Sequence, residues 1–396
     1  MITPAVRAAI RNALPPLAPG INIPVVLAIV GGLLIAAAFL AFVAAHWTEI
    51  ARLLRLAILL AGIVVAHGLG AWFARAGRQI HADLCAGVGS IIFGAGIALV
   101  GQMYHLGDDF AGGMLLWAVG ALTAAVLTGS RGALAVALAA ASIWSCTRAF
   151  EVSDVTHFSF VAIWFVAAGL ALAWNSRAAA HLVALAALPW WIAAALRSDL
   201  QPTFVLADGA ALLFGAGLAL AAAPWRRASS AGAVLSSYGA FSLAGVAILQ
   251  VATANDLFRV QSWAAGQPMW AILCGGTGAI FAFAVAATTR RAGAAFAGGA
   301  IGLVLLAAAT LPKEGEPWLT YALELSAVLC LVVSGMLDAA RPRIIAGWIG
   351  IAGVVAGITW AVKGSLLRRS AFLAVAGAAA VGLATVLNRL LPRADE

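Results

Sequence analysis

The chain has 396 residues, of which 64% are hydrophobic and only 10% are charged. Soluble globular proteins carry about a quarter charged residues, and disordered chains have low hydrophobicity, so this composition excludes both classes. What remains is an all-α, polytopic integral membrane protein with no soluble domain. A net charge of +8 would suggest a nucleic-acid partner in a soluble protein. Here the charges lie in loops between apolar runs, where they set topology, so we expect a lipid bilayer and no nucleic acid as partner.

Residues 1–20 precede the first apolar run and are predicted to form a short amphipathic tail. Apolar residues recur every four positions from Ile2 to Leu14, as on one face of a helix. Such a segment suits the surface of an anionic cytoplasmic leaflet, and a frayed tail is the alternative. The apolar run 23–45 is longer than a signal-peptide core, so it predicts a first transmembrane helix instead of a cleavable leader.

Apolar runs separated by charged or polar breaks predict about fourteen transmembrane helices, because one span needs about 20 apolar residues. The predicted spans are 23–45, 53–73, 84–103, 113–129, 132–147, 157–174, 178–196, 203–223, 231–252, 264–287, 292–310, 318–336, 344–361 and 370–387. We divide them into an N-terminal membrane region, residues 21–147, and a C-terminal membrane region, residues 148–396. The break at Arg131, between the predicted spans 113–129 and 132–147, is very short.

The arginine residues predict the orientation, because cytoplasmic loops carry an excess of cations. With the N-terminus inside, 14 cations fall in inner segments and 9 in outer ones. Both termini are therefore expected in the cytoplasm of a bacterium, with the helices in its inner membrane. Lys363, Arg368 and Arg369 run against this bias. Tryptophans near span ends, such as Trp72, Trp144, Trp225, Trp318, Trp348 and Trp360, fit an interfacial belt.

Two motifs of small residues predict close helix contacts. Gly298 and Gly302 lie four residues apart in one span, and Gly353 and Gly357 in another. Small residues at this spacing let helix backbones approach where lipid supplies no hydrophobic drive between them.

The most polar stretch closes the third predicted span. Its members, with the polar end of the first span on the same side, are Gln102, Tyr104, His105, Asp108, Asp109, His46 and Glu49. Histidine and carboxylate side chains could bind a cation or a polar head group at the outer face, or carry protons. The alternative is a helix end followed by a solvated turn. Because no pair of these histidine and carboxylate residues lies four positions apart within one predicted span, as helical metal ligands do, we expect no metal and no cofactor.

Two acids lie inside apolar runs, Asp208 in the eighth predicted span and Glu324 in the twelfth. Ionisable residues at membrane depth are costly and indicate function by default. Each lies about 6 residues past the outer end of its span, or roughly 9 Å deep, so both could line one cavity. Desolvation disfavours the charged form, so either could carry a proton or bind a cation. A protonated or snorkelling acid bonded to a neighbouring helix is the alternative.

Other polar residues in the spans are less informative. A packing role is expected for His67, which stands alone in the second span. Cys85 shares a helical face with His81 but Asp83 points away, so a three-ligand metal site is not expected there. The sequence contains no nucleophile elbow, phosphate loop or H-E-x-x-H motif, and these are the usual signs of an enzyme.

The N-terminal third resembles a family of uncharacterised bacterial predicted membrane proteins, domain of unknown function 2157. The resemblance covers roughly residues 25–145. It rests on the segment from Phe42 to Glu49, on the third span from Phe93 to His105, and on Asp108 with the residues that follow, including Leu115-Leu116-Trp117-Ala118. The Gln-x-Tyr-His segment is its most specific part. The resemblance implies a polytopic bacterial membrane protein without an established activity.

Three functions fit this sequence. The first is a carrier or flippase-like transporter of a small solute or lipid-linked molecule, with Asp208 and Glu324 as proton or cation sites. The second is a membrane enzyme acting on an envelope or lipid precursor at the outer face, with His105 and Asp108 as acid–base groups. The third is a membrane scaffold or assembly factor. The sequence leaves the oligomeric state open.

Overall fold

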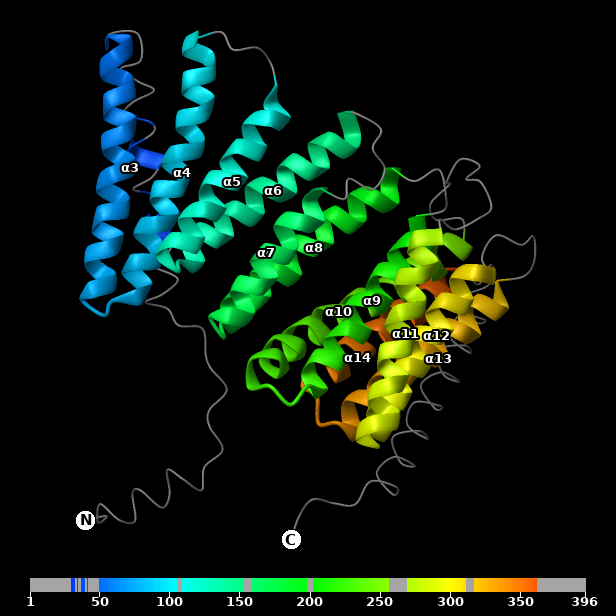
Figure 1. Ribbon diagram of the computed structural model, residues 1–396. Helices are drawn as coiled ribbons and strands as arrows, with labels where there is room; N and C mark the ends of the chain where they lie inside the picture. Colours follow the sequence, from blue (N-terminus) through cyan, green and yellow to red (C-terminus); the bar gives the residue numbers. More distant parts are fainter. Residues whose placement is uncertain are drawn as a thin grey trace, which may run out of the picture. The chain divides into compact units, whose positions relative to one another are not determined.

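The computed structural model describes residues 50–104, 109–151, 159–197, 202–255, 269–310 and 317–361, with part of a helix at residues 30–41 (Figure 1). The predicted tail, most of the first predicted span and the last predicted span, 370–387, lie outside the described residues.

The described residues form helices and contain no strand, which confirms the predicted all-α fold. The helices are α3 (Arg52–Arg75), α4 (Gln79–Tyr104), α5 (Phe110–Thr128), α6 (Arg131–Glu151), α7 (Ser159–Ala173), α8 (Arg177–Arg197), α9 (Pro202–Ala222), α10 (Arg226–Ala254), α11 (Met269–Thr289), α12 (Ala292–Thr310), α13 (Trp318–Leu337) and α14 (Arg341–Ala361). Among the described residues, 11 helices are long and apolar enough to cross a membrane, and α7 is shorter. Each corresponds to one predicted span, including the pair that meets at Arg131.

Short turns join the helices in pairs, and several of them contain a residue with left-handed backbone. These residues are Gly77 (φ 72°), Gly129 (φ 65°), Asn175 (φ 49°), Arg290 (φ 53°) and Ala339 (φ 53°). A left-handed residue ends a helix by turning the chain away from the helix axis while the last carbonyl groups stay bonded. The charged or polar breaks that the sequence predicts between these spans therefore coincide with turns at which a helix ends abruptly.

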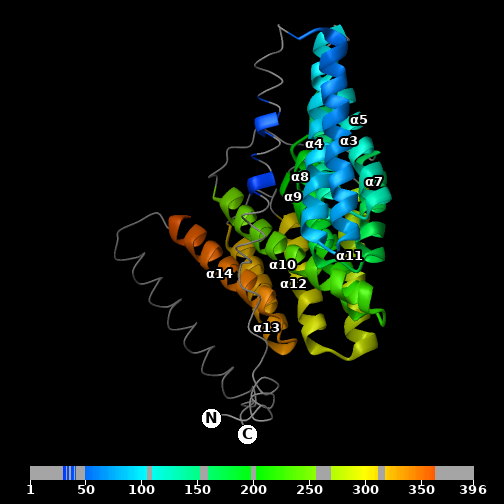
Figure 2. The same cartoon turned by 90° about the vertical axis from the view of Figure 1, so that its left-hand side faces the viewer.

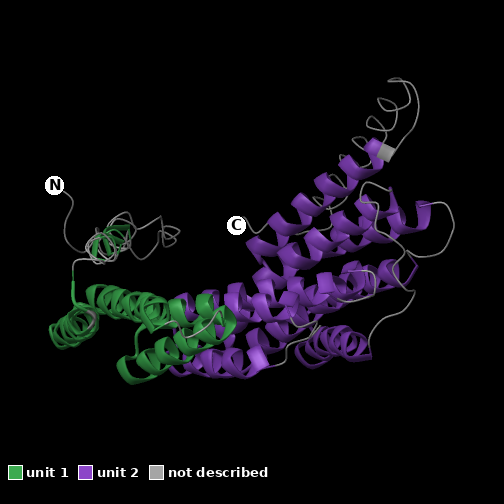
Figure 3. Ribbon diagram, turned by 90° about the horizontal axis from the view of Figure 1, so that it is seen from above, with its two compact units in different colours: residues 1–141 green, residues 142–396 purple. Residues whose placement is uncertain are grey.

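Contacts divide the chain into two compact units, residues 1–141 and residues 142–396 (Figure 3). In the first unit, α3, α4 and α5 lie side by side (Figures 1 and 2). The Trp117 indole on α5 donates a 2.8 Å hydrogen bond to the carbonyl oxygen of Ser90 on α4. Its ring occupies the space in which a side chain at Gly94 would lie. On α3, His67 bonds the Ile63 carbonyl of its own helix at 3.0 Å and packs against Gly89, as a packing histidine does.

In the second unit, α9 is the central helix and packs closely on α10 and α11. At Gly215 the α9 backbone meets the backbone of Gly278 on α11, and at Gly217 it meets the backbone of Ser236 on α10. No side chain could be added at either glycine without a collision. Such approaches give the van der Waals contact that holds membrane helices together.

The glycine contacts also fix the direction of each helix in this unit. On α11, Gly275 faces Asp208 and Gly278 faces Ala211, so α9 and α11 run in the same direction. By the same comparison, α10 runs against α9, α12 against α11 and α13 against α14, and α14 runs with α10. The odd-numbered helices α9, α11 and α13 therefore start at one end of the bundle, and α10, α12 and α14 finish there. The other end carries Arg226, Arg227, Arg290, Arg291, Arg341 and Arg343, and we call it the arginine end.

The two predicted small-residue motifs differ in the structure. Gly353 and Gly357 of α14 face Ile248 and Val251 of α10, so this motif forms a helix contact. Gly298 faces Phe283 of α11, but nothing lies within 4 Å of a side-chain carbon built at Gly302. Among the described residues, therefore, Gly298 of this motif forms a helix contact and Gly302 does not.

The tryptophans predicted to form a belt are mostly exposed. The exposed fractions are 57% for Trp72, 74% for Trp225, 57% for Trp318, 51% for Trp348 and 67% for Trp360. Exposed indoles near helix ends suit the head-group region of a bilayer.

Trp144 differs from the other tryptophans predicted to lie in the belt, because only 7% of its surface is exposed. It lies one to two turns inside α6 and packs within the protein.

Candidate functional site

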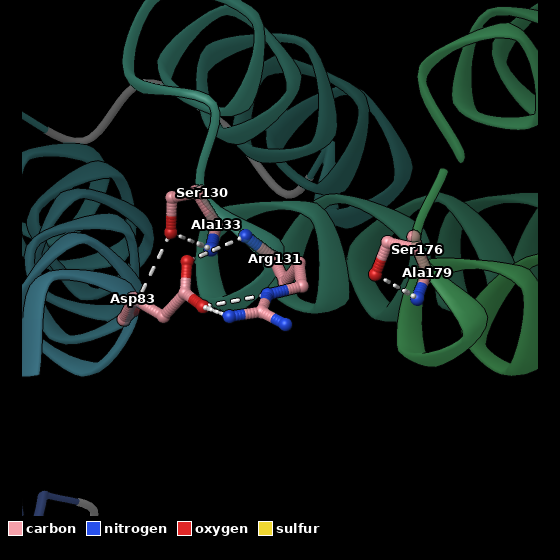
Figure 4. Close-up of polar contacts among 6 residues, drawn as sticks. All are labelled: Asp83, Ser130, Arg131, Ala133, Ser176 and Ala179. Atoms are coloured by element: carbon pink, nitrogen blue, oxygen red, sulfur yellow. Dashed lines mark hydrogen bonds and ion pairs between the residues drawn. The ribbon is translucent and has the colours of Figure 1, made fainter. Parts of the chain in front are cut away.

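An ion pair joins α4 to the start of α6 in the first unit (Figure 4). The Asp83 carboxylate accepts hydrogen bonds from the Arg131 backbone N–H at 2.9 Å and from the Arg131 Nε at 2.7 Å. The Ser130 hydroxyl bonds the Asp83 carbonyl oxygen at 3.4 Å. Because a carboxylate at a helix N-terminus satisfies a free N–H and offsets the helix dipole, Asp83 has a structural role.

A second ion pair lies at the arginine end of the second unit. Arg343 donates to the Asp338 carboxylate at 2.6 Å and to the Ser334 hydroxyl at 3.3 Å. The Asp338 carboxylate lies against Gly293 in the first turn of α12, where the helix dipole favours negative charge. The Arg343 guanidinium also lies 5.8 Å from the centre of the Phe214 ring on α9. This pair, in which the arginine is buried, therefore links α9, α12, α13 and α14.

The predicted outer cluster is only partly within the described residues. His46, Glu49, His105 and Asp108 lie outside them. Gln102 and Tyr104 are exposed at the end of α4, and neither side chain forms a hydrogen bond within the described part of the chain. The described residues also contain no group of three or more His, Cys, Asp or Glu side chains that could hold a metal ion.

Asp109 lies at the start of α5. Its carboxylate accepts a 2.8 Å hydrogen bond from the backbone N–H of Gly112, so it is the N-cap of that helix. Within the predicted cluster, Asp109 therefore has a structural role as a helix cap. The polar sequence pattern alone does not distinguish that role from binding.

Asp208 is buried on α9, with 2% of its surface exposed. Its carboxyl group lies against Gly275 on α11, where a side-chain carbon would collide with the Asp208 Oδ1, and next to Leu305 on α12. The Asp208 Oδ2 is buried and has no hydrogen-bond partner among the described residues. The missing side chain of Gly275 therefore makes the space that the carboxyl group occupies.

Glu324 is fully buried on α13. Its neighbours along the helix, Tyr321 and Val328, belong to the apolar core between α10, α13 and α14. Ala327 belongs to the core around α9 and α12. Both carboxyl oxygens of Glu324 are buried and have no hydrogen-bond partner in the described part of the chain. Such a group is costly unless a proton or a cation neutralises it.

The structure adds a third buried polar residue, Gln250 on α10, which the sequence did not single out. It is fully buried, its amide nitrogen donates to the Val304 carbonyl of α12 at 3.5 Å, and its Oε1 has no partner among the described residues. A neutral amide near the end of an apolar run gives no charge signal. Its only sequence signal is that it is a large polar residue within a predicted span.

These three side chains lie in the same half of the second unit, the half away from the arginine end. Asp208 and Glu324 each come six residues after the first residue of their parallel helices, Pro202 and Trp318, about 9 Å along the axis. Gln250 comes four residues before the end of α10, which runs the opposite way. We call Asp208, Gln250 and Glu324 the buried polar layer. Gln250 bonds Val304 of α12, and Asp208 and Leu305 of α12 both lie against Gly275.

A polar bridge lies between this layer and the nearer end of the bundle. The Tyr321 hydroxyl donates to the Asn255 side-chain oxygen, and the Asn255 amide donates to the Gly357 carbonyl at 2.8 Å. Tyr321 is one helical turn closer to the end than Glu324. The Tyr321–Asn255 bridge therefore joins α10, α13 and α14 beside Glu324.

Residues 1–134 match the model of a family described as "Predicted membrane protein (DUF2157)". The match confirms the resemblance to this family that the residues of the third predicted span indicate. No curated protein and no solved structure matches the chain. Together, the matched residues and the helices of spanning length identify a multi-pass membrane protein. The second unit, with the buried polar layer, lies beyond the matched residues.

Proposed function

We propose that this protein is a membrane carrier for a small solute or a lipid-linked molecule, in which Asp208 and Glu324 bind and release protons or a cation. The observation that carries the proposal is the buried polar layer. Two acids in the same half of the second unit leave three buried carboxyl oxygens without hydrogen-bond partners among the described residues. A structural ion pair would satisfy such atoms, as the Asp338–Arg343 pair does.

The cost of these acids supports a functional role. An acid at the centre of a membrane helix costs about 2.5–3.5 kcal/mol on insertion scales. No counter-charge lies within 4.0 Å of either carboxyl group in the described part of the chain. A proton neutralises such a group, and its release requires a change in the surroundings. A carrier that exposes the layer alternately to the two sides supplies that change.

The two ends of the bundle supply contacts that could open in turn. The Tyr321–Asn255 bridge holds α10 and α13 together between Glu324 and the nearer end. The Asp338–Arg343 pair holds α13 and α14 at the arginine end. Breaking one set of contacts while keeping the other would expose the layer on one side only, as alternating access requires. In this proposal the arginine end faces the cytoplasm, which the cation bias of the sequence supports.

A reconstituted assay tests the proposal. Proteoliposomes containing phosphatidylethanolamine with a fluorescent nitrobenzoxadiazole head group are treated with dithionite, which bleaches only the outer leaflet. We expect the full chain to move the probe between leaflets faster than protein-free vesicles do. Asp208→Asn and Glu324→Gln are expected to slow the movement.

Glu151→Gln is the matched control, because it makes the same chemical change as Glu324→Gln at an exposed site outside the buried polar layer. A probe rate equal to that of protein-free vesicles contradicts carriage of this lipid class. Equal loss of rate in the layer variants and the control contradicts the role of the layer.

A further inference from the structure

A large apolar cavity lies in the second unit between α7, α8, α9, α10 and α11. Its volume is about 1060 Å³, at the upper end of the roughly 300–1,000 Å³ of small-molecule sites. Trp164, Trp191, Leu213 and Leu249 are among its lining side chains.

Polar groups are nearly absent from the cavity wall. Ser242 supplies the only hydroxyl side chain among the lining residues. The Trp164 indole N–H donates to the Val183 carbonyl at 2.8 Å, and the Trp191 indole N–H donates to the Val205 carbonyl. A buried water needs two to four polar partners, so this wall is unsuited to water. An empty cavity would instead lose van der Waals contacts along its whole wall.

The cavity reaches the exposed surface of α7, α8 and α11. Phe165, Ile192 and Phe281 line it and are themselves 65%, 47% and 38% exposed. Gly169 and Gly245 also line it, and nothing lies within 4 Å of a side-chain carbon built at either. Around helices of spanning length, the molecules that meet such an opening are lipids.

The length of the cavity limits its occupant further. Its lining residues on α9 run from Leu206 to Leu220, a rise of about 21 Å at 1.5 Å per residue. One leaflet supplies only about 15 Å of hydrocarbon, half of a core about 30 Å thick. A chain that fills the cavity therefore extends past the middle of the bilayer. The wall also includes Gly209 and Cys274, the chain neighbours of Asp208 and Gly275.

We infer that this cavity binds the hydrocarbon chain of a lipid, and that the substrate of the proposed carrier is a lipid-linked molecule whose chain lies there. The second clause rests on the proposed function, whereas chain binding does not. The cavity adjoins Asp208 of the buried polar layer through α9 and α11, so a bound chain would lie beside one of the two acids proposed to exchange protons.

Photo-crosslinking tests the inference on the full chain. The probe is a phosphatidylethanolamine with a diazirine in the middle of one acyl chain, in proteoliposomes of phosphatidylethanolamine and phosphatidylglycerol. After illumination, peptide mass spectrometry locates the adducts. We expect adducts on Leu213 and Leu249, which are half-buried in the cavity wall, as well as on exposed Phe283 outside the cavity.

Filling variants supply the comparison. Gly169→Leu and Gly245→Leu each add a side chain to the open space, and both are expected to lose the adducts on Leu213 and Leu249 while keeping that on Phe283. Gly302→Leu is the matched control, because its site on α12 is equally open and lies outside the cavity. Adducts on Phe283 without any on Leu213 or Leu249 in the unaltered chain would overturn the inference, as would adducts that persist in both filling variants. A predicted span of this chain or a second copy seated in the cavity would produce the first of these outcomes.

The crosslinking and flipping assays test the two proposals independently. Cavity adducts without probe movement would support chain binding and contradict the proposed carrier function. Probe movement without cavity adducts would leave the carrier standing and overturn the lipid-chain site.

Discussion

Asp208 on α9 and Gly275 on α11 face each other so closely that the carboxyl group occupies the space of the absent side chain. The two residues lie at equal distances from the starts of two parallel helices. A buried acid is thus built into a helix contact that otherwise uses only small and apolar residues.

Replacing that glycine is expected to destabilise the bundle. In Gly275→Ala the added methyl group collides with the Asp208 Oδ1, and overpacking of this kind costs about 1–3 kcal/mol. Thermal unfolding in detergent measures the loss. Gly276→Ala is the control, since nothing lies within 4 Å of a side-chain carbon there. The double variant Gly275→Ala, Asp208→Ala should recover most of the loss, and a strictly additive result would show that the two residues are not coupled.

Loss of the buried arginine is expected to cost more than loss of the exposed arginine in the same turn. Arg343→Ala leaves the partly buried Asp338 carboxylate unpaired, at a cost of up to about 3 kcal/mol, the lower end of the range for a fully buried pair. Arg341→Ala, the control, should change the free energy of unfolding little, because that side chain is exposed. Unfolding in graded denaturant measures both variants. Equal effects would mean that the ion pair adds nothing to stability.

In the first unit, Asp83→Ala is expected to be more harmful than Arg131→Ala. Both remove the ion pair, whose Arg131 side chain is 40% exposed. Only Asp83→Ala also removes the acceptor for the Arg131 backbone N–H, and a lost N-cap costs about 1 kcal/mol. Comparison of the two unfolding midpoints checks the order. The reverse order would show that the guanidinium makes a larger contribution than the cap.

Asp109→Ala separates a structural role from a binding role in the outer cluster. The change removes the N-cap of α5 and should cost about 1 kcal/mol of stability. Asp109→Asn should retain the cap and the stability, because asparagine is an equally good N-cap. If Asp109→Asn keeps stability but abolishes probe movement in the proteoliposomes, the residue has a role beyond the cap.

Breaking the Tyr321–Asn255 bridge should make Glu324 easier to reach. Tyr321→Phe removes the hydroxyl that bonds Asn255, while the Asn255 bond to Gly357 remains. We expect a hydrophobic carbodiimide to label Glu324 faster in this variant, as measured by peptide mass spectrometry. Thr359→Val, which removes a hydroxyl that bonds only its own helix, is the control. An unchanged labelling rate in Tyr321→Phe would show that the bridge does not limit access.

Much of the fold follows from the sequence because a membrane helix is determined locally. Charged breaks and apolar runs predict each described helix from α3 to α14, including the sharp stop at Gly129. The same logic finds Asp208 and Glu324, because an acid in an apolar run is visible without a partner.

Contacts between helices account for what the sequence could not predict. Asp83 and Arg131 are 48 positions apart, so nothing local pairs them. Gln250 carries no charge, and its depth matters only once α10 is seen to run against α9 and α13. The apolar cavity arises from the spacing of five helices, and the residues that line it look like any other lipid-facing residues in the sequence.

The central claim is that protons or a cation at Asp208 and Glu324 drive the carrier, and its most direct test is the rate of probe movement from acid to alkaline pH. The unaltered chain should show a rate that changes with pH. Asp208→Asn and Glu324→Gln, which hold no exchangeable acid at those positions, should give lower rates that change little. If both variants follow the unaltered chain at every pH, the assignment of these two acids as proton or cation sites is contradicted.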